Sequence, residues 1–157
     1  MAGGMQRLRG LLRDAKGSVA VETALISPIL LAMVFGAVDL ANGFAMKLKL
    51  EQAAGRAAEL ATAPGTVSGS YANLRDEVIA AYGGTYTAAT VDNWLECGST
   101  RNASFTGICG AGLQTARYVS IQISAEYVPY INFAGLLTGS GPNGGFMTTG
   151  DAVVRIQ

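Results

Sequence analysis

The chain has 157 residues and a formal net charge of zero, and only 14% of its residues are charged. Without a basic excess it lacks the electrostatic means to bind nucleic-acid phosphates, and its length allows one modest domain plus a membrane element. It contains no His, which removes the commonest general base and the commonest metal ligand. We therefore expect no cofactor, no metal and no nucleic-acid partner.

The N-terminal region changes abruptly from basic to apolar. Residues 1–17 form a short leader with an excess of Arg and Lys, which we expect to be cytoplasmic. Residues 19–38 then carry one charge, Glu22, and as an α-helix they would be about 30 Å long, the thickness of a bilayer's hydrocarbon core. This predicts a single membrane-spanning helix with the rest of the chain exported.

Three interpretations of this region stay open from the residues alone. A cleaved secretory signal has a shorter apolar core followed by a small-x-small site, whereas here the apolar run is longer and no convincing Ala-x-Ala boundary follows it. A plain signal anchor accounts for the apolar run but not for its acid. A carboxylate inside a bilayer costs roughly 2.5–3.5 kcal/mol at a helix centre and less near an edge, so Glu22 either reaches the interface or has a partner. Cleavage after Gly17 would supply one, because the freed Ser18 amine of one subunit could pair with Glu22 of its neighbour.

The start of the apolar run has a recognisable pattern: Gly17-Ser18-Val19-Ala20-Val21-Glu22, then Ala24, Pro28, Leu30-Leu31 and Phe35-Gly36. This pattern resembles the start of TadE-like minor pilins, which belong to the tight-adherence (Flp) branch of type IV pili. The resemblance implies that a prepilin peptidase cuts between Gly17 and Ser18 and that Glu22 is the pilin glutamate at the fifth mature position. Thr23 departs from the pattern, because many members carry Phe there.

The function implied by this resemblance is structural. We expect a minor pilin or pseudopilin of the bacterial inner membrane that takes part in assembling an adhesive Flp/Tad-type pilus, with its C-terminal domain in the periplasm. The implied partners are a prepilin peptidase, other pilin and minor-pilin subunits, the inner-membrane assembly platform and membrane lipid. An alternative is a membrane-anchored periplasmic assembly factor or sensor that never enters a filament. We do not expect an enzyme, because the sequence lacks a nucleophile elbow and a phosphate-binding loop with Lys.

Helical character continues past the apolar run and predicts one long helix over residues 18–63, stopped by Pro64-Gly65. Its exported half carries an apolar stripe at i, i+4, i+7 and i+11: Leu50, Ala54, Ala57 and Ala61. This stripe packs either on the chain's own domain or on neighbouring helices, or on both at its two ends. Small residues and a proline suit close packing of membrane helices, and the candidate positions are Ala24, Pro28, Gly36 and Gly43.

Residues 66–157 are predicted to form an extracytoplasmic α+β domain with an antiparallel sheet. A helix is expected within residues 70–82, and a strand that includes Trp94 within residues 85–96. The clearest strand is 116–128, where apolar residues alternate with polar ones, and a final strand, 151–156, is expected to pair with it. Trp94 is interpreted as a core or interface side chain.

Two features of this domain lie in its loops. Cys97 and Cys109 are the chain's two cysteines, and in an exported segment they predict a disulfide that stabilises the domain by about 2–4 kcal/mol, the alternative being two buried thiols. The apolar connector 130–137 either caps the core or docks on other subunits or on the membrane surface.

Overall fold

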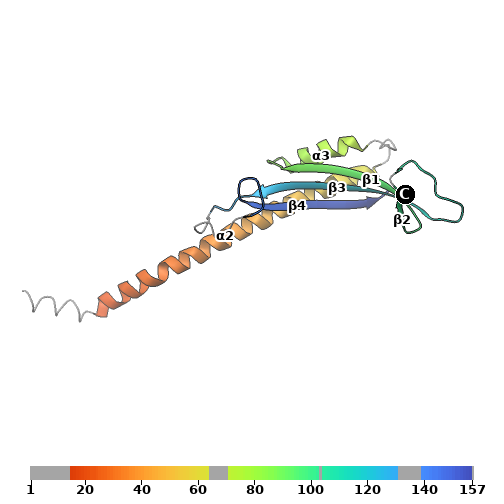
Figure 1. Ribbon diagram of the computed structural model, residues 1–157. Helices are drawn as coiled ribbons and strands as arrows, with labels where there is room; N and C mark the ends of the chain where they lie inside the picture. The colour runs from red at the N-terminus through yellow and green to blue at the C-terminus, as the bar shows by residue number, and fades with distance from the viewer. Residues whose placement is uncertain (1–14, 64–70, 103, 131–138, 157) are drawn as a thin grey trace, which may run out of the picture. The chain divides into compact units, whose positions relative to one another are not determined.

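The structure, a computed structural model, describes residues 15–63, 71–102, 104–130 and 139–156, without the side chains of residues 15–18. Figure 1 shows their elements in chain order: α2 (Ala15–Thr62), α3 (Ala72–Tyr82), β1 (Ala88–Cys97), β2 (Thr100–Asn102), β3 (Thr115–Tyr127) and β4 (Phe146–Arg155). A long N-terminal helix is followed by an antiparallel four-stranded sheet, so the predicted α+β fold class is confirmed.

The chain divides into two compact units, Met1–Ala41 and Asn42–Gln157, and the boundary falls inside α2. Of the first unit, the structure describes residues 15–41 of that helix. The second unit contains the remainder of α2 together with α3 and the whole sheet. The packing described below belongs to this second unit.

The sheet has the strand order β2-β1-β3-β4, and each neighbouring pair is antiparallel. The central strand, β3, has 13 residues and pairs with β1 and β4 along almost its full length. Its side chains alternate as predicted: Val119, Ile121, Ile123 and Ala125 are fully buried. Because side chains in a strand alternate between the two faces, one face of the sheet forms the core and the other remains open.

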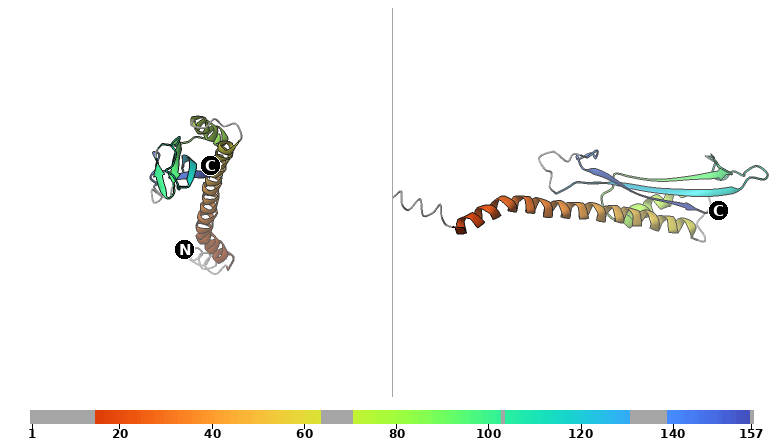
Figure 2. Two further views of the ribbon diagram at one scale, coloured as in Figure 1. Left: turned by 90° about the vertical axis from the view of Figure 1, so that its right-hand side faces the viewer. Right: turned by 90° about the horizontal axis from the view of Figure 1, so that it is seen from below.

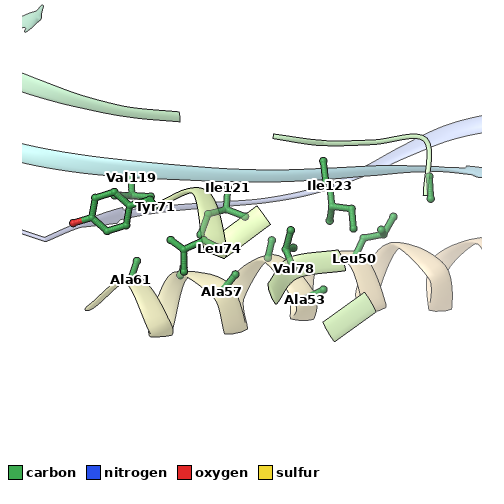
Figure 3. Packing of buried hydrophobic residues seen from close by; sticks show 14 of the residues in the cluster. Leu50, Ala53, Ala57, Ala61, Tyr71, Leu74, Val78, Val119, Ile121 and Ile123 are labelled. Atoms are coloured by element: carbon green, nitrogen blue, oxygen red, sulfur yellow. The ribbon is translucent and has the colours of Figure 1, made fainter. Parts of the chain in front are cut away.

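Residues 42–62 of α2 and the whole of α3 cover the same face of the sheet (Figure 2). Figure 3 shows their contacts, with Ile123 opposite Leu50 at one end of the core and Val119 near Ala61 at the other. The predicted helix stripe is confirmed, because all four of its residues are buried. Each large apolar side chain buried here, such as Leu50 or Ile121, stabilises the fold by about 1.5–3 kcal/mol.

α3 is joined to the sheet and ends at a glycine. Gly83 has φ +65°, and its N–H donates to the carbonyl oxygen of Ile79 at 3.1 Å, a left-handed cap that other residues adopt only with strain. The Arg75 Nε donates to the carbonyl oxygen of Ala89 in β1 at 3.0 Å. Leu74 and Val78 are buried against the sheet, so the short predicted helix completes the core.

The loop after β1 is closed by a disulfide between Cys97 and Cys109, whose Cα atoms are 5.4 Å apart. The predicted disulfide is therefore confirmed. Arg117 in β3 also holds this loop, with Nε and Nη2 donating to the carbonyl oxygens of Phe105 and Gly107 at 3.0 and 3.1 Å. The loop contains the short strand β2, which the sequence did not predict because its three residues are all polar.

The last strand begins at Phe146, five residues before the predicted start, and this bound of the prediction was wrong. Glu126 explains the extra pairing. Its Oε1 accepts hydrogen bonds from the backbone N–H groups of Asn143 and Gly145 at 2.8 and 2.7 Å, and its Oε2 accepts one from Asn143 Nδ2 at 2.8 Å. The carboxylate thus fixes the glycine-rich turn before β4, and Met147 then pairs with Glu126.

The open face of the sheet carries an aromatic pair. Trp94 and Tyr118 stack with ring centroids 5.4 Å apart and an interplanar angle of 18°. The guanidinium of Arg101 lies 4.1 Å from the Trp94 ring centroid and pairs with the carboxylate of Asp92. Trp94 is half-buried on this face and lies outside the hydrophobic core.

Candidate assembly and membrane-anchoring segment

The predicted cleavage bond lies in the first turn of α2. The helix begins at Ala15, so Gly17 and Ser18 have helical backbone. Glu22 follows Ser18 by four residues, which corresponds to about 6 Å along the axis and the same side of a helix. Glu22 is exposed, and its carboxylate has no hydrogen bond or ion pair with the residues that the structure describes. Ser18 and Glu22 therefore lie about one helical turn apart on the same side of α2.

The apolar run that follows is uncovered by the rest of the described chain. Large side chains are exposed all around it, with Leu25 at 70% and Met33 at 68% exposure. Within the described residues, α2 is the one helix long and apolar enough to cross a membrane, and its most apolar window is 0% buried. The core helix of a soluble domain would be covered by its own fold, so this exposure is typical of a helix that meets lipid or other helices.

Pro28 lies inside α2 without ending it. Proline has no N–H, so the carbonyl oxygen of Ala24, four residues earlier, loses its usual backbone donor. The hydroxyl of Ser27 donates to that oxygen at 3.4 Å. Thr23 similarly donates to the carbonyl oxygen of Val19 at 2.9 Å. Both hydroxyls are satisfied within the helix, which suits a segment without access to water.

The four predicted packing positions have different surroundings. Ala24 and Pro28 are exposed on the helix, and a Cβ atom added at Gly36 would have no neighbour within 4 Å. A Cβ at Gly43 would instead lie 3.6 Å from two ring carbons of Tyr127. Gly43 therefore gives room to the chain's own β3, whereas the other three positions remain open to a neighbouring helix.

Several structurally important residues were not identified from the sequence. Glu126 was expected to face water on the open side of β3, but it holds the glycine-rich turn. The run of glycines just before the last strand was the available signal, because glycines allow backbone N–H groups to converge on an anion. The role of Ser27 could have been inferred from its position beside Pro28 in a helix. Of the connector 130–137, only Tyr130 lies within the described residues.

No three His, Cys, Asp or Glu side chains come together within the parts of the chain that the structure describes. Residues 17–59 match the family model described as TadE-like protein. The matched segment begins at Gly17, contains Glu22, and covers the apolar run and most of the remainder of α2, which confirms the resemblance there. No curated protein and no solved structure matches the chain.

Proposed function

We propose that this chain, whose residues 17–59 are a TadE-like segment, is a minor pilin or pseudopilin that takes part in assembling a pilus of the tight-adherence type. The observation that carries the proposal is the position of Glu22, four residues after Ser18 at the start of an exposed apolar helix. An acid at this depth is costly in lipid unless it meets a cation.

In the proposed pathway the basic leader stays in the cytoplasm, residues 19–38 span the inner membrane, and the domain of residues 66–157 is periplasmic. A prepilin peptidase cuts between Gly17 and Ser18. The new α-amine is positively charged and lies at the edge of the membrane. In the assembly, the Glu22 carboxylate of one subunit pairs with the Ser18 amine of the next, which offsets the cost of holding either charge in lipid.

The role we propose for the helix is mechanical and not enzymatic. Before assembly it anchors the subunit beside the assembly platform. During assembly its exposed side chains exchange lipid for neighbouring helices, and the open surface around Ala24 and Gly36 lets those helices approach closely. Adhesion is a property of the resulting pilus in this proposal, and the domain carried by the helix supplies its outer surface.

The charge pairing is tested by Glu22→Ala in cells that produce the pilus. Because the peptidase acts at Gly17 and Ser18, we expect leader removal to continue, while the amount of pilus in the sheared fraction falls at least tenfold. A tenfold change corresponds to about 1.4 kcal/mol, less than the several kcal/mol expected when one partner of a desolvated pair is removed.

Glu59→Ala is the matched control, because it makes the same change at an exposed position of α2 beyond the apolar run. This variant should give wild-type pilus yield. Wild-type yield from Glu22→Ala would contradict the pairing. In wild-type cells that make pili, a chain found in the membrane fraction and absent from the sheared pili would favour the assembly factor or sensor that never enters a filament.

A further inference from the structure

One end of the second unit exposes a group of large apolar side chains. We call this group the apolar collar, and its residues are Phe44, Leu48, Val128, Tyr130, Phe146 and Met147. The remaining exposed large apolar residues described in this unit are scattered, with Ile108 and Leu113 in the disulfide loop and its flank. Clustering of this kind marks an interaction surface, whereas single exposed apolar residues are ordinary.

The contacts within the unit show that the collar belongs to one end. The ring of Tyr127, the last residue of β3, lies against Gly43 of α2. Val128 follows Tyr127 in the chain, Phe146 is paired with Tyr127 across the sheet, and Phe44 follows Gly43. The end of the β3–β4 hairpin and the first turns of α2 in this unit therefore present their apolar side chains at the same level.

The surface changes from apolar to polar directly beyond the collar. After Leu48 most exposed side chains of α2 are polar: Lys49, Glu51, Gln52, Arg56, Glu59 and Thr62, with Leu60 a single apolar exception at 39% exposure. Three of these, Lys49, Gln52 and Arg56, line a hollow of about 430 Å³ together with Ala53, Ala81 and Tyr82. The apolar surface thus forms a band with a polar boundary, as in proteins that rest in a lipid interface.

We propose that the apolar collar is seated in the lipid headgroup layer of the membrane that α2 spans. This inference rests on the proposed function only in requiring α2 as a membrane anchor. Gly43 follows Asp39, the outer polar boundary of the apolar run, by four residues, which even a fully extended chain keeps within about 14 Å. The interfacial layer on each side of the hydrocarbon core is about 5–8 Å thick. The covalent chain therefore holds this end beside the bilayer.

The chemistry of the collar fits lipid as its occupant. Phe44, Tyr130 and Phe146 are aromatic, and Tyr130 is 85% exposed. Aromatic side chains at membrane–water interfaces anchor proteins, because a ring can lie at the level of the headgroups. The covalent connection to the membrane helix keeps lipid next to the apolar collar in every subunit that has not left the membrane. A second copy of the chain is available only on encounter.

The test uses the full chain in vesicles of phosphatidylethanolamine and phosphatidylglycerol, with one Trp as a depth probe. Trp94→Phe removes the natural Trp, and Phe146→Trp then places the probe in the collar. Val153→Trp in the same background is the control, because Val153 is 58% exposed on the same strand, seven residues further on. Lipids with a spin label near the headgroup should quench the probe at residue 146 at least twofold more than the probe at residue 153.

Equal quenching at the two positions would overturn the inference. So would a probe at residue 146 that is shielded from both the lipid label and aqueous acrylamide, because a protein partner would then cover the collar. Phe44→Trp in the same background repeats the measurement from α2 and guards against a hairpin variant that does not fold. A chain that fails to float with the vesicles would contradict the membrane anchor and with it the proposed function. A chain that floats with unquenched probes would contradict the seating of the collar alone.

Discussion

Gly150 in β4 lies directly against the backbone of Leu50 in α2. A Cβ atom at residue 150 would come within 2.2 Å of the Leu50 carbonyl carbon and 2.3 Å of its oxygen, distances that no side chain can occupy. Around this point the helix contributes mainly Ala to the core. Small residues on the helix and a glycine on the strand together let α2 lie close to the sheet, so this contact sets the spacing of the two layers.

Gly150→Ala should therefore destabilise the second unit by overpacking. The neighbouring atoms are backbone and cannot rotate away, so we expect the free energy of unfolding to fall by about 1–3 kcal/mol or more. Thermal or urea unfolding of the full chain in detergent, followed by circular dichroism, measures the change.

Gly55→Ala is the matched control, because a Cβ at that helical position has no neighbour within 4 Å. Removing a glycine from a helix interior should raise stability by about 1 kcal/mol. If Gly150→Ala were as stable as Gly55→Ala, the close packing of α2 on β4 would be contradicted.

The hydrogen bonds that the Glu126 carboxylate accepts from the turn before β4 predict a pH dependence of stability. Desolvation raises the pKa of this carboxyl, but hydrogen bonds from the Gly145 backbone and from the Asn143 side chain and backbone outweigh it, so its pKa lies below the ordinary 4.5. A folded-state pKa below the unfolded value contributes stability that is present above about pH 4.5 and is lost as the pH falls further. Unfolding of the wild-type chain should therefore become easier below pH 4.5.

Glu126→Gln should remove the pH-dependent stability that the ionised carboxylate contributes. The neutral amide of Gln cannot accept the three hydrogen bonds that the ionised carboxylate accepts, so the variant should be less stable at pH 7. Because the amide does not titrate, the variant should also lose less stability than the wild type between pH 7 and pH 3.5. Glu59→Gln, on the exposed side of α2, should behave like the wild type. Identical pH profiles for Glu126→Gln and the wild type would show that the turn does not depend on the carboxylate.

The disulfide between Cys97 and Cys109 should stabilise the fold even though other contacts also hold its loop. Closing a segment with a sequence separation of 12 restricts the unfolded chain and is worth about 2–4 kcal/mol. Replacing both cysteines by Ser, or reducing the wild-type protein, should lower the midpoint of thermal unfolding to a similar extent. An unchanged midpoint in both cases would mean that Arg117 and the buried Phe105 ring already fix the loop in the absence of the bond.

The sequence was most informative where a residue pattern had a regular period. Alternation along β3 and the i, i+4, i+7 stripe of α2 each mark a buried face, because every residue in the pattern has the same environment. The long helix, α3 and the central strand were therefore predictable to within a few residues. The disulfide was predictable from the expected export of this segment and from the even number of cysteines.

The remaining features depend on contacts between distant residues, which have no local signal. β4 starts early because Glu126, about 20 residues before it, holds the turn that leads into it. Gly150 is required by Leu50, a hundred residues away. The opposite-face cluster of Trp94, Tyr118 and Arg101 likewise exists only once the strands are paired in register. The cleavage bond and the partner of Glu22 involve other molecules and remain predictions.

The mature N-terminus is the most direct test of the account as a whole. Mass spectrometry of the chain from membrane fractions and from sheared cell-surface material should identify Ser18 as the first residue, with residues 1–17 absent. A chain that keeps Met1 or Met5 in every fraction, or that begins well beyond residue 38, would contradict the proposal, because Glu22 would then have no new amine beside it.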